Sequence, residues 1–271
     1  MIKGLPNLYS FLHLTQTGLN KILDKIDKYY KPKREPKKKY GEYQRDNRGR
    51  IKYRDLLVPI YPLKLAQQRI NDLLQNIDLP DYMFGSIPKR NHIINAQQHL
   101  NQTHFLAIDL KKFFPNINHF QVHEMFLNQG FSHAVSHILT KLTTHQKSLP
   151  QGAPTSPVIA NLVFLNTAQR LFEFAKTYNL TFTNYLDDQS FSSKKSFKEL
   201  VPQILAIIKQ NKFFPAHDKI HYRINRCEIT GLIVNGNKLQ LMPEMTEKAR
   251  TNIHLKAYVN LVKKYNHQQK N

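Results

Sequence analysis

Three aspartates lie where strand-type segments of the sequence end. Asp109 lies near the end of the apolar run HFLAIDL, and Asp187 and Asp188 lie at the turn of the strand-turn-strand pattern LTFTNYLDDQSFSS. Each aspartate alone has an ordinary explanation, because Asp is a favoured turn residue. Carboxylates at the ends of adjacent antiparallel strands can converge, however, and such a cluster is tolerable only if it binds cations. We therefore expect these three residues to hold two Mg²⁺ ions, the arrangement that in-line phosphoryl transfer uses.

The elements that position these aspartates follow from the hydrophobic pattern. Strand-type segments lie at residues 51–62, 104–110, 180–193, 220–224 and 229–242. Apolar residues recur at helical spacing over residues 8–30, 63–77, 118–129, 132–144, 156–177, 196–210 and 244–265. The sequence therefore predicts an α+β fold whose strands carry the aspartates.

The charge balance points to a polyanionic partner. The 271 residues include 40 Lys and Arg against 19 Asp and Glu, a net charge of +21, and 41% of the chain is apolar. This composition is typical of a folded protein that binds nucleic acid or an acidic surface. Residues 31–54 alone contain 11 basic and 3 acidic residues. The lysine-rich part, residues 31–39, could contact nucleic acid, and the alternative is that it is a solvated linker.

Other classes of protein are excluded by composition. A single Cys excludes a disulfide framework and a four-cysteine zinc module. The two His-x-x-x-His pairs, His119 with His123 and His133 with His137, lack the Glu that a zinc-protease helix carries after its first His. The sequence contains no membrane-length apolar run and no recognisable leader, so we expect a cytoplasmic protein without a membrane partner.

Three motifs between and around the aspartates resemble those of reverse transcriptases. FFPNI follows Asp109, and LPQGAPTSP and then YLDD follow in the order and spacing of that family. NAQQH at residues 95–99 and ITG at residues 229–231 are similar to the NAxxH and VTG motifs of retron reverse transcriptases. The resemblance covers about residues 43–242, including Arg54 and the LKxxQ pattern of residues 63–67. It implies a right-hand polymerase with fingers and N-terminal helices at 1–95, a palm at 96–242 with part of the fingers interleaved, and a short helical thumb at 243–271.

The resemblance also assigns roles to individual residues. It implies that the three aspartates are the catalytic metal ligands and that Phe114, five residues after Asp109, excludes ribonucleotides by contact with the sugar, while Phe113 belongs to the core. Arg54 would clamp the triphosphate, although contact with the template backbone is an alternative for it. The nucleotide-binding set is Arg54, Phe114, Gln151, Gly152 and Lys219, and the nucleic-acid-binding set is Lys37, Lys38, Lys39, Asn95, His99 and Tyr185. Nearby Tyr29, Tyr30, Tyr40, Tyr43 and Tyr53 could stack on bases or pack in the core.

The implied function is RNA-directed DNA synthesis of the retron type. Such an enzyme uses dNTPs to copy a structured noncoding RNA that is both template and primer, starts from an RNA 2′-hydroxyl, and leaves an RNA–DNA hybrid and a branched product, msDNA. The family further implies anti-phage defence, a separate effector protein and template removal by a host ribonuclease H. The alternatives are another bacterial defence or group II intron-like reverse transcriptase with different priming, or an RNA-binding scaffold for an effector.

Overall fold

A computed structural model describes residues 1–39 and 42–267 of the chain. The chain forms two compact units, the first of Met1–Asp78 with Lys112–Phe164 and the second of Leu79–Lys111 with Leu165–Asn271. These units group the residues differently from the predicted fingers, palm and thumb bounds, which stay a prediction. Helices and antiparallel strands occur together, as the α+β prediction requires.

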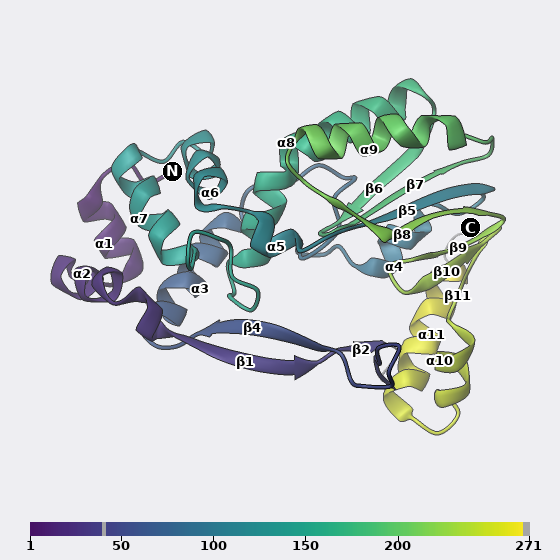
Figure 1. The fold of residues 1–271 in the computed structure, drawn as a ribbon, viewed down its shortest axis with the longest axis horizontal. Helices are drawn as coiled ribbons and strands as arrows, with labels where there is room; N and C mark the ends of the chain where they lie inside the picture. The colour runs from purple at the N-terminus through teal and green to yellow at the C-terminus, as the bar shows by residue number, and fades with distance from the viewer. Residues whose placement is uncertain (40–41, 268–271) are drawn as a thin grey trace. The chain divides into compact units, whose positions relative to one another are not determined.

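In the first unit, helices enclose an apolar core (Figure 1). Predicted helical segments appear as α1 (Leu5–Leu12), α2 (Gln16–Asp24), α3 (Leu63–Leu74), α6 (His119–Asn128) and α7 (His133–Thr143), with the 3-10 turn η1 at Ile26–Tyr29 and the short helix α5 at Phe113–Asn116. Side-chain caps begin two of them: the Thr15 hydroxyl accepts the Gly18 N–H at 3.0 Å, and Asn118 forms a capping box with Gln121. Leu8, Ile70 and Leu139 are fully buried.

The basic segment forms strands over most of its length, and the predicted contact of its lysines with nucleic acid stays a prediction. Strand β1 (Tyr30–Pro36) pairs antiparallel with β4 (Tyr53–Pro59), and the hairpin β2 (Lys38–Lys39) and β3 (Glu42–Tyr43) follows. Pro32 lies opposite Leu57, whose N–H donates to the Gln151 carbonyl oxygen at 2.8 Å and so points away from β1. Pro32 therefore occupies a pair without ladder hydrogen bonds, where its missing N–H is harmless, and Pro36 has the same parity.

The second unit is built on an antiparallel sheet with strand order β6-β7-β5-β8. The strands are β5 (His104–Leu110), β6 (Thr181–Tyr185), β7 (Asp188–Ser193) and β8 (Pro215–Ile224). The helix α8 (Ser156–Thr177), which enters this unit at Leu165, and α9 (Val201–Gln210), preceded by the 3-10 turn η2 (Lys198–Leu200), cover one face (Figure 1). The other face carries α4 (His92–Gln97) and the small sheet of β9 (Arg226–Ile229), β10 (Leu232–Asn235) and β11 (Lys238–Gln240).

Strand alternation decides which face of the sheet receives Asp109. Phe105 is buried against α4, β9 and β10, with Ala107 packed at the edge of the same cluster. Because alternate residues share a face, Asp109 lies on this side of β5, and the helices α8 and α9 cover the opposite side.

The C-terminal helices α10 (Pro243–Lys248) and α11 (Ile253–His267) confirm the predicted closing helices. Val262 of α11 is buried in the same core cluster as Phe105. The Asn266 amide donates to the Leu239 carbonyl oxygen and accepts the Leu239 N–H, both at 2.9 Å, so it satisfies the outer edge of β11 as a further strand would. Among the helices of the described residues, none is long and apolar enough to cross a bilayer.

Candidate active site

The three predicted aspartates meet at one end of the sheet in the second unit. Asp109 of β5 lies directly opposite Asp188 of β7 in the strand register, and Asp187 occupies the turn that precedes β7. The Leu110 N–H donates to the Asp187 carbonyl oxygen at 2.8 Å, which fastens this turn to β5. Adjacent antiparallel strands therefore bring together carboxylates that are 78 and 79 positions apart in the sequence.

The turn between β6 and β7 is strained and braced. Leu186 adopts a φ of +55°, a conformation that costs a non-glycine residue about 1–3 kcal/mol. The buried amides of Asn184 and Gln189 both donate to the Leu186 carbonyl oxygen, at 2.8 and 3.1 Å. Gly85 packs against the turn so closely that a Cβ atom would lie 2.7 Å from the Leu186 backbone nitrogen. Sequence reasoning missed these supporting residues, and the amides that flank YLDD were the available signal.

Like charges dominate the electrostatics of the site. Burial raises the pKa of Asp188 to about 7, and the negative charges of Asp187 and Asp109 add to that rise. The Lys219 ammonium opposes it and donates to Asp109 Oδ2 at 2.7 Å. Burial alone would lower the Lys219 pKa, but the bond to Asp109 and the neighbouring aspartates outweigh it and raise that pKa. Lys219, predicted to bind nucleotide, thus contacts Asp109, one of the three predicted metal ligands.

The carboxylates fit a divalent cation by their chemistry. Across the residues that the structure describes, no three His, Cys, Asp or Glu side chains are already gathered into a metal-binding arrangement, and Asp109 is paired with Lys219. The available donors are all carboxylate oxygens, which Mg²⁺ prefers. Burial, and then the charges of Asp187 and Asp109, raise the pKa of Asp188, and a bound cation would offset the repulsion between these carboxylates.

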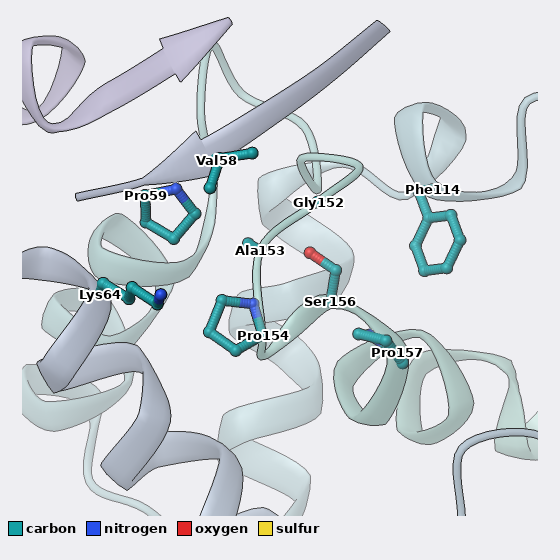
Figure 2. A pocket seen from close by; sticks show the side chains of 9 residues that line it. All are labelled: Val58, Pro59, Lys64, Phe114, Gly152, Ala153, Pro154, Ser156 and Pro157. Carbon is teal, nitrogen blue, oxygen red and sulfur yellow. The ribbon is translucent and has the colours of Figure 1, made fainter. Parts of the chain in front are cut away.

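A separate pocket of about 330 Å³ lies in the first unit (Figure 2). Phe114 points into it from α5, opposite Val58 and Pro59 of β4, whereas Phe113 is 3% exposed and meets Phe164 edge-on with ring centroids 5.7 Å apart. The two neighbouring rings therefore have different surroundings: Phe113 packs in the core, and Phe114 lines the pocket.

The LPQGAPTSP loop forms another wall of this pocket and is tied to β4. Gly152 has a φ of +113°, and a Cβ atom there would lie 3.1 Å from Leu56 Cβ. The Gln151 carbonyl oxygen accepts the Leu57 N–H. The missing Cβ of Gly152 thus lets the loop approach strand β4 closely.

The remaining predicted contact residues differ in exposure. Arg54 is exposed on β4 opposite Glu35, and Tyr185 is half-buried opposite Asp188, where burial and then the Asp188 charge raise its pKa. Lys37 and Lys38 are exposed, and the Lys38 ammonium lies 4.9 Å from the Tyr43 ring centroid.

The tyrosines also divide between surface and core. Tyr53 is exposed beneath the Arg34 guanidinium, 4.4 Å from its ring centroid. Tyr30 is buried, accepts a hydrogen bond from Gln67 Nε2 at 2.8 Å and packs on His145, so it is not available to stack on bases. Tyr40 lies outside the described residues.

Asn95 and His99, predicted to bind nucleic acid, are both buried inside the second unit, and their contact with nucleic acid stays a prediction. Asn95 is 1% exposed and donates to Thr230 Oγ1 at 3.2 Å, and Thr230 donates in turn to the His92 carbonyl oxygen at 3.1 Å. His99 is fully buried, with its ring nitrogens 2.6 Å from Ser192 Oγ and 2.8 Å from Thr183 Oγ1. The NAQQH and ITG motifs are thus joined to each other inside the second unit.

An antiparallel sheet with helices on one face and convergent aspartates at one end is the palm of a right-hand nucleotide polymerase. The chain belongs to the reverse transcriptase family: residues 36–248 match the family described as "Reverse transcriptase (RNA-dependent DNA polymerase)". It is therefore an RNA-directed DNA polymerase, and an RNA template is its partner.

The chain is similar to several retron reverse transcriptases. The chain is 27% identical to the Retron Se72 reverse transcriptase of Salmonella heidelberg over 95% of its length and 68% of that protein. It is 26% identical to the Retron Ec86 reverse transcriptase of Escherichia coli over 80% of its length and 69% of that protein. The prediction of a retron-type reverse transcriptase is confirmed.

A solved structure shows the same fold at lower identity. Apo telomerase from Candida tropicalis superposes with a TM-score of 0.52 and 13% identity, covering 82% of this chain and 52% of the telomerase chain. The chain thus spans about half the length of that protein. This likeness supports the predicted right-hand polymerase fold.

Proposed function

We propose that this chain copies a cognate, structured noncoding RNA into single-stranded DNA and that Asp109, Asp187 and Asp188 hold the two Mg²⁺ ions of the reaction. The observation that carries the proposal is the pairing of Asp109 with Asp188 across β5 and β7, with Asp187 fastened beside them. When bound, divalent ions supply positive charge to the attacking and leaving oxygens of phosphoryl transfer.

The protein's own residues fix the site for that reaction. The amides of Asn184 and Gln189 hold the turn that carries Asp187, and Lys219 orients Asp109. The hydroxyl oxygen at the primer end bonds to the α-phosphorus of the dNTP as the bond to pyrophosphate breaks, and the hydroxyl proton passes to solvent. Lys219 is more than half exposed, so its ammonium can also turn toward the phosphates of the nucleotide.

We assign the binding and selection of the nucleotide to residues of the first unit. Phe114 is the ring that meets the sugar, because it lines a pocket whereas Phe113 does not. Gly152 lines that pocket, and Gln151 holds the loop on β4 by accepting the Leu57 N–H. Arg54 binds the triphosphate as a bidentate donor from the exposed surface of β4.

The noncoding RNA is proposed to be both template and primer, with synthesis starting from an RNA 2′-hydroxyl. Lys37, Lys38 and Lys39 contact its phosphates, and Tyr185 contacts the primer end beside Asp188. We further propose that the enzyme acts in anti-phage defence with a separate effector protein. A host ribonuclease H removes the template, and the enzyme is located in the cytoplasm. The retron-type motifs and relatives favour it over other priming schemes.

The central test is primer extension by an Asp187→Asn variant. Loss of this metal ligand is expected to abolish DNA synthesis while leaving the melting temperature and RNA binding nearly unchanged, because Asp187 lies in a half-buried turn outside the apolar core. Asp72→Asn, an equal charge change on the surface of α3, is the matched control and should retain activity. Substantial synthesis by folded Asp187→Asn would refute the metal assignment.

The priming mode has its own test. The protein, expressed with its genomic flanks, is isolated with its nucleic acid, and the DNA is examined for a covalent link to RNA that survives denaturation. A branched 2′–5′ junction supports the retron scheme, whereas free DNA with an ordinary 5′ end supports the alternative reverse transcriptases.

A further inference from the structure

A second cavity, of about 570 Å³, lies in the second unit beyond the end of the palm sheet that faces away from the catalytic aspartates. It is lined by the ends of strands and helices: residues just before β5 and β6, the end of β7, the residues that follow α8 and the loop before α9. Asp188 begins β7 and Ser193 ends it, so about 17 Å of strand separates the two sites. Its size suits a nucleotide-sized ligand.

The lining combines a flat aromatic surface with an apolar floor. Tyr178 is 44% exposed at the rim, and its ring is backed by Phe174 one helical turn earlier, with centroids 4.7 Å apart. Phe197 and Leu180, both buried, form the floor. A ring that is held in place yet exposed is the platform on which an unpaired base stacks.

Two adjacent lysines add positive charge at the rim. Lys194 and Lys195 are exposed, and within the described part of the chain neither makes an ion pair. Their loop is fixed, because the Phe197 N–H donates to the Tyr222 hydroxyl at 3.0 Å and the Lys195 N–H donates to Ser193 Oγ at 3.2 Å. Two ammonium groups on a fixed loop match the phosphate of a nucleotide.

The acidic side chain of Glu199 favours a nucleotide over an acidic peptide as the ligand of the cavity. Glu199 lines the same cavity and is exposed. Its carboxylate would repel a peptide carboxylate, but it can accept hydrogen bonds from the amino group of a base such as cytosine. The side-chain amides of Gln102 and Asn179 provide further donors and acceptors for a base edge.

We propose that this cavity binds one unpaired nucleotide of an RNA strand, with the base on Tyr178, its amino group at Glu199 and its phosphate at Lys194 and Lys195. The proposal rests on the proposed RNA partner of the enzyme. It places a second RNA contact outside the polymerase site, where it anchors the RNA without taking part in synthesis.

Lysine footprinting of the full chain tests this directly. The protein is acetylated with and without an oligocytidine of about 12 nucleotides, and modification is read at each lysine by mass spectrometry. We expect the RNA to protect Lys194 and Lys195, while the equally exposed Lys209 and Lys212 at the end of α9 serve as internal controls. Equal acetylation of Lys194 and Lys195 with and without RNA would overturn the proposal.

Further ligands separate the possible sources of protection. A duplex of the same length should not protect these lysines, because paired bases cannot enter the cavity. Equal protection by the duplex would mean that the lysines contact phosphate alone, and it would overturn the proposal. Protection by free cytidine monophosphate as complete as that by the oligonucleotide would assign the site to free nucleotides instead. Oligouridine should protect more weakly than oligocytidine, and Glu199→Gln should reduce that difference.

Variants of Tyr178 complete the test. Tyr178→Ala should weaken the protection about tenfold in RNA concentration, whereas Tyr178→Phe keeps the ring and should retain it. Unchanged protection in Tyr178→Ala would contradict the stacking role. Primer extension is measured in parallel. If the protein synthesises DNA but RNA does not protect Lys194 and Lys195, only this inference is refuted. If RNA protects these lysines but the protein synthesises no DNA, only the polymerase assignment is refuted.

Discussion

The buried His99 makes the stability of the second unit depend on pH. Its ring is fully buried between two hydroxyl groups, and burial lowers its pKa to about 3. The unfolded chain binds a proton at the ordinary value near 6.5, so the unfolded state holds more protons than the folded state between these values. The contribution of His99 is therefore fully present above about pH 6.5 and is lost as the pH falls toward 3.

The magnitude follows from linkage. At pH 5 the unfolded chain binds a proton at His99, because this pH lies 1.5 units below the ordinary pKa of 6.5, whereas the folded chain does not. Lowering the pH from 7.5 to 5 therefore reduces the free energy of unfolding by about 2 kcal/mol. His99→Gln removes the titrating group and retains one donor and one acceptor for the hydroxyls of Ser192 and Thr183. We expect this variant to be less stable at neutral pH but to lose about 2 kcal/mol less than the original chain over the same pH range.

Urea unfolding followed by circular dichroism at the two pH values measures both losses. His221→Gln, a change of an exposed histidine in the same unit, is the matched control and should leave the pH dependence as it is in the original chain. Groups that titrate in every variant cancel in the comparison. If the original chain and His99→Gln lose equal stability between pH 7.5 and pH 5, His99 is not the buried neutral group that the structure shows.

Three further changes test other parts of the molecule. Phe114→Ala should admit ribonucleotides while retaining incorporation of deoxynucleotides in single-nucleotide assays, and unchanged sugar discrimination would place the gate elsewhere. Substitution of the lysines at residues 37–39 by Gln should flatten the slope of log K for RNA against log salt by about 0.7–0.9 for each lost phosphate contact, and an unchanged slope would leave those lysines solvated. Gly152→Ala should lower the free energy of unfolding by more than Gly49→Ala does. Both glycines have a positive φ, but only at Gly152 would the new Cβ meet neighbouring atoms. Equal decreases in the free energy of unfolding, measured by urea unfolding, would contradict this prediction.

The catalytic strands could be predicted from the sequence because their signals are local. HFLAIDL is a short apolar run, and YLDD interrupts a period-2 pattern, so each strand end was visible before the pairing was known. Helix α8 likewise spans Ser156–Thr177, the predicted range, because its apolar residues recur at helical spacing over six turns.

Strand β1 could not be predicted in the same way, because its stability comes from a distant partner. Pro32 and Pro36 argue locally against a strand. The register with β4 places both prolines in pairs without ladder hydrogen bonds, as the Leu57 N–H that donates to Gln151 shows. A pattern within residues 30–36 contains none of this information.

The role of the NAQQH motif shows the same limit at a single residue. Asn95 and Thr230 are 135 positions apart, and no periodicity joins them. Thr230 is a β-branched residue at a φ of +46°, which is unfavourable unless other contacts hold it. Its hydroxyl accepts from Asn95 and donates to the His92 carbonyl oxygen, and these bonds hold the turn between β9 and β10 against α4. Motif position led to the prediction that Asn95 and His99 bind nucleic acid, and no local pattern could show that Asn95 also bonds to Thr230 beneath the face of the sheet that carries Asp109.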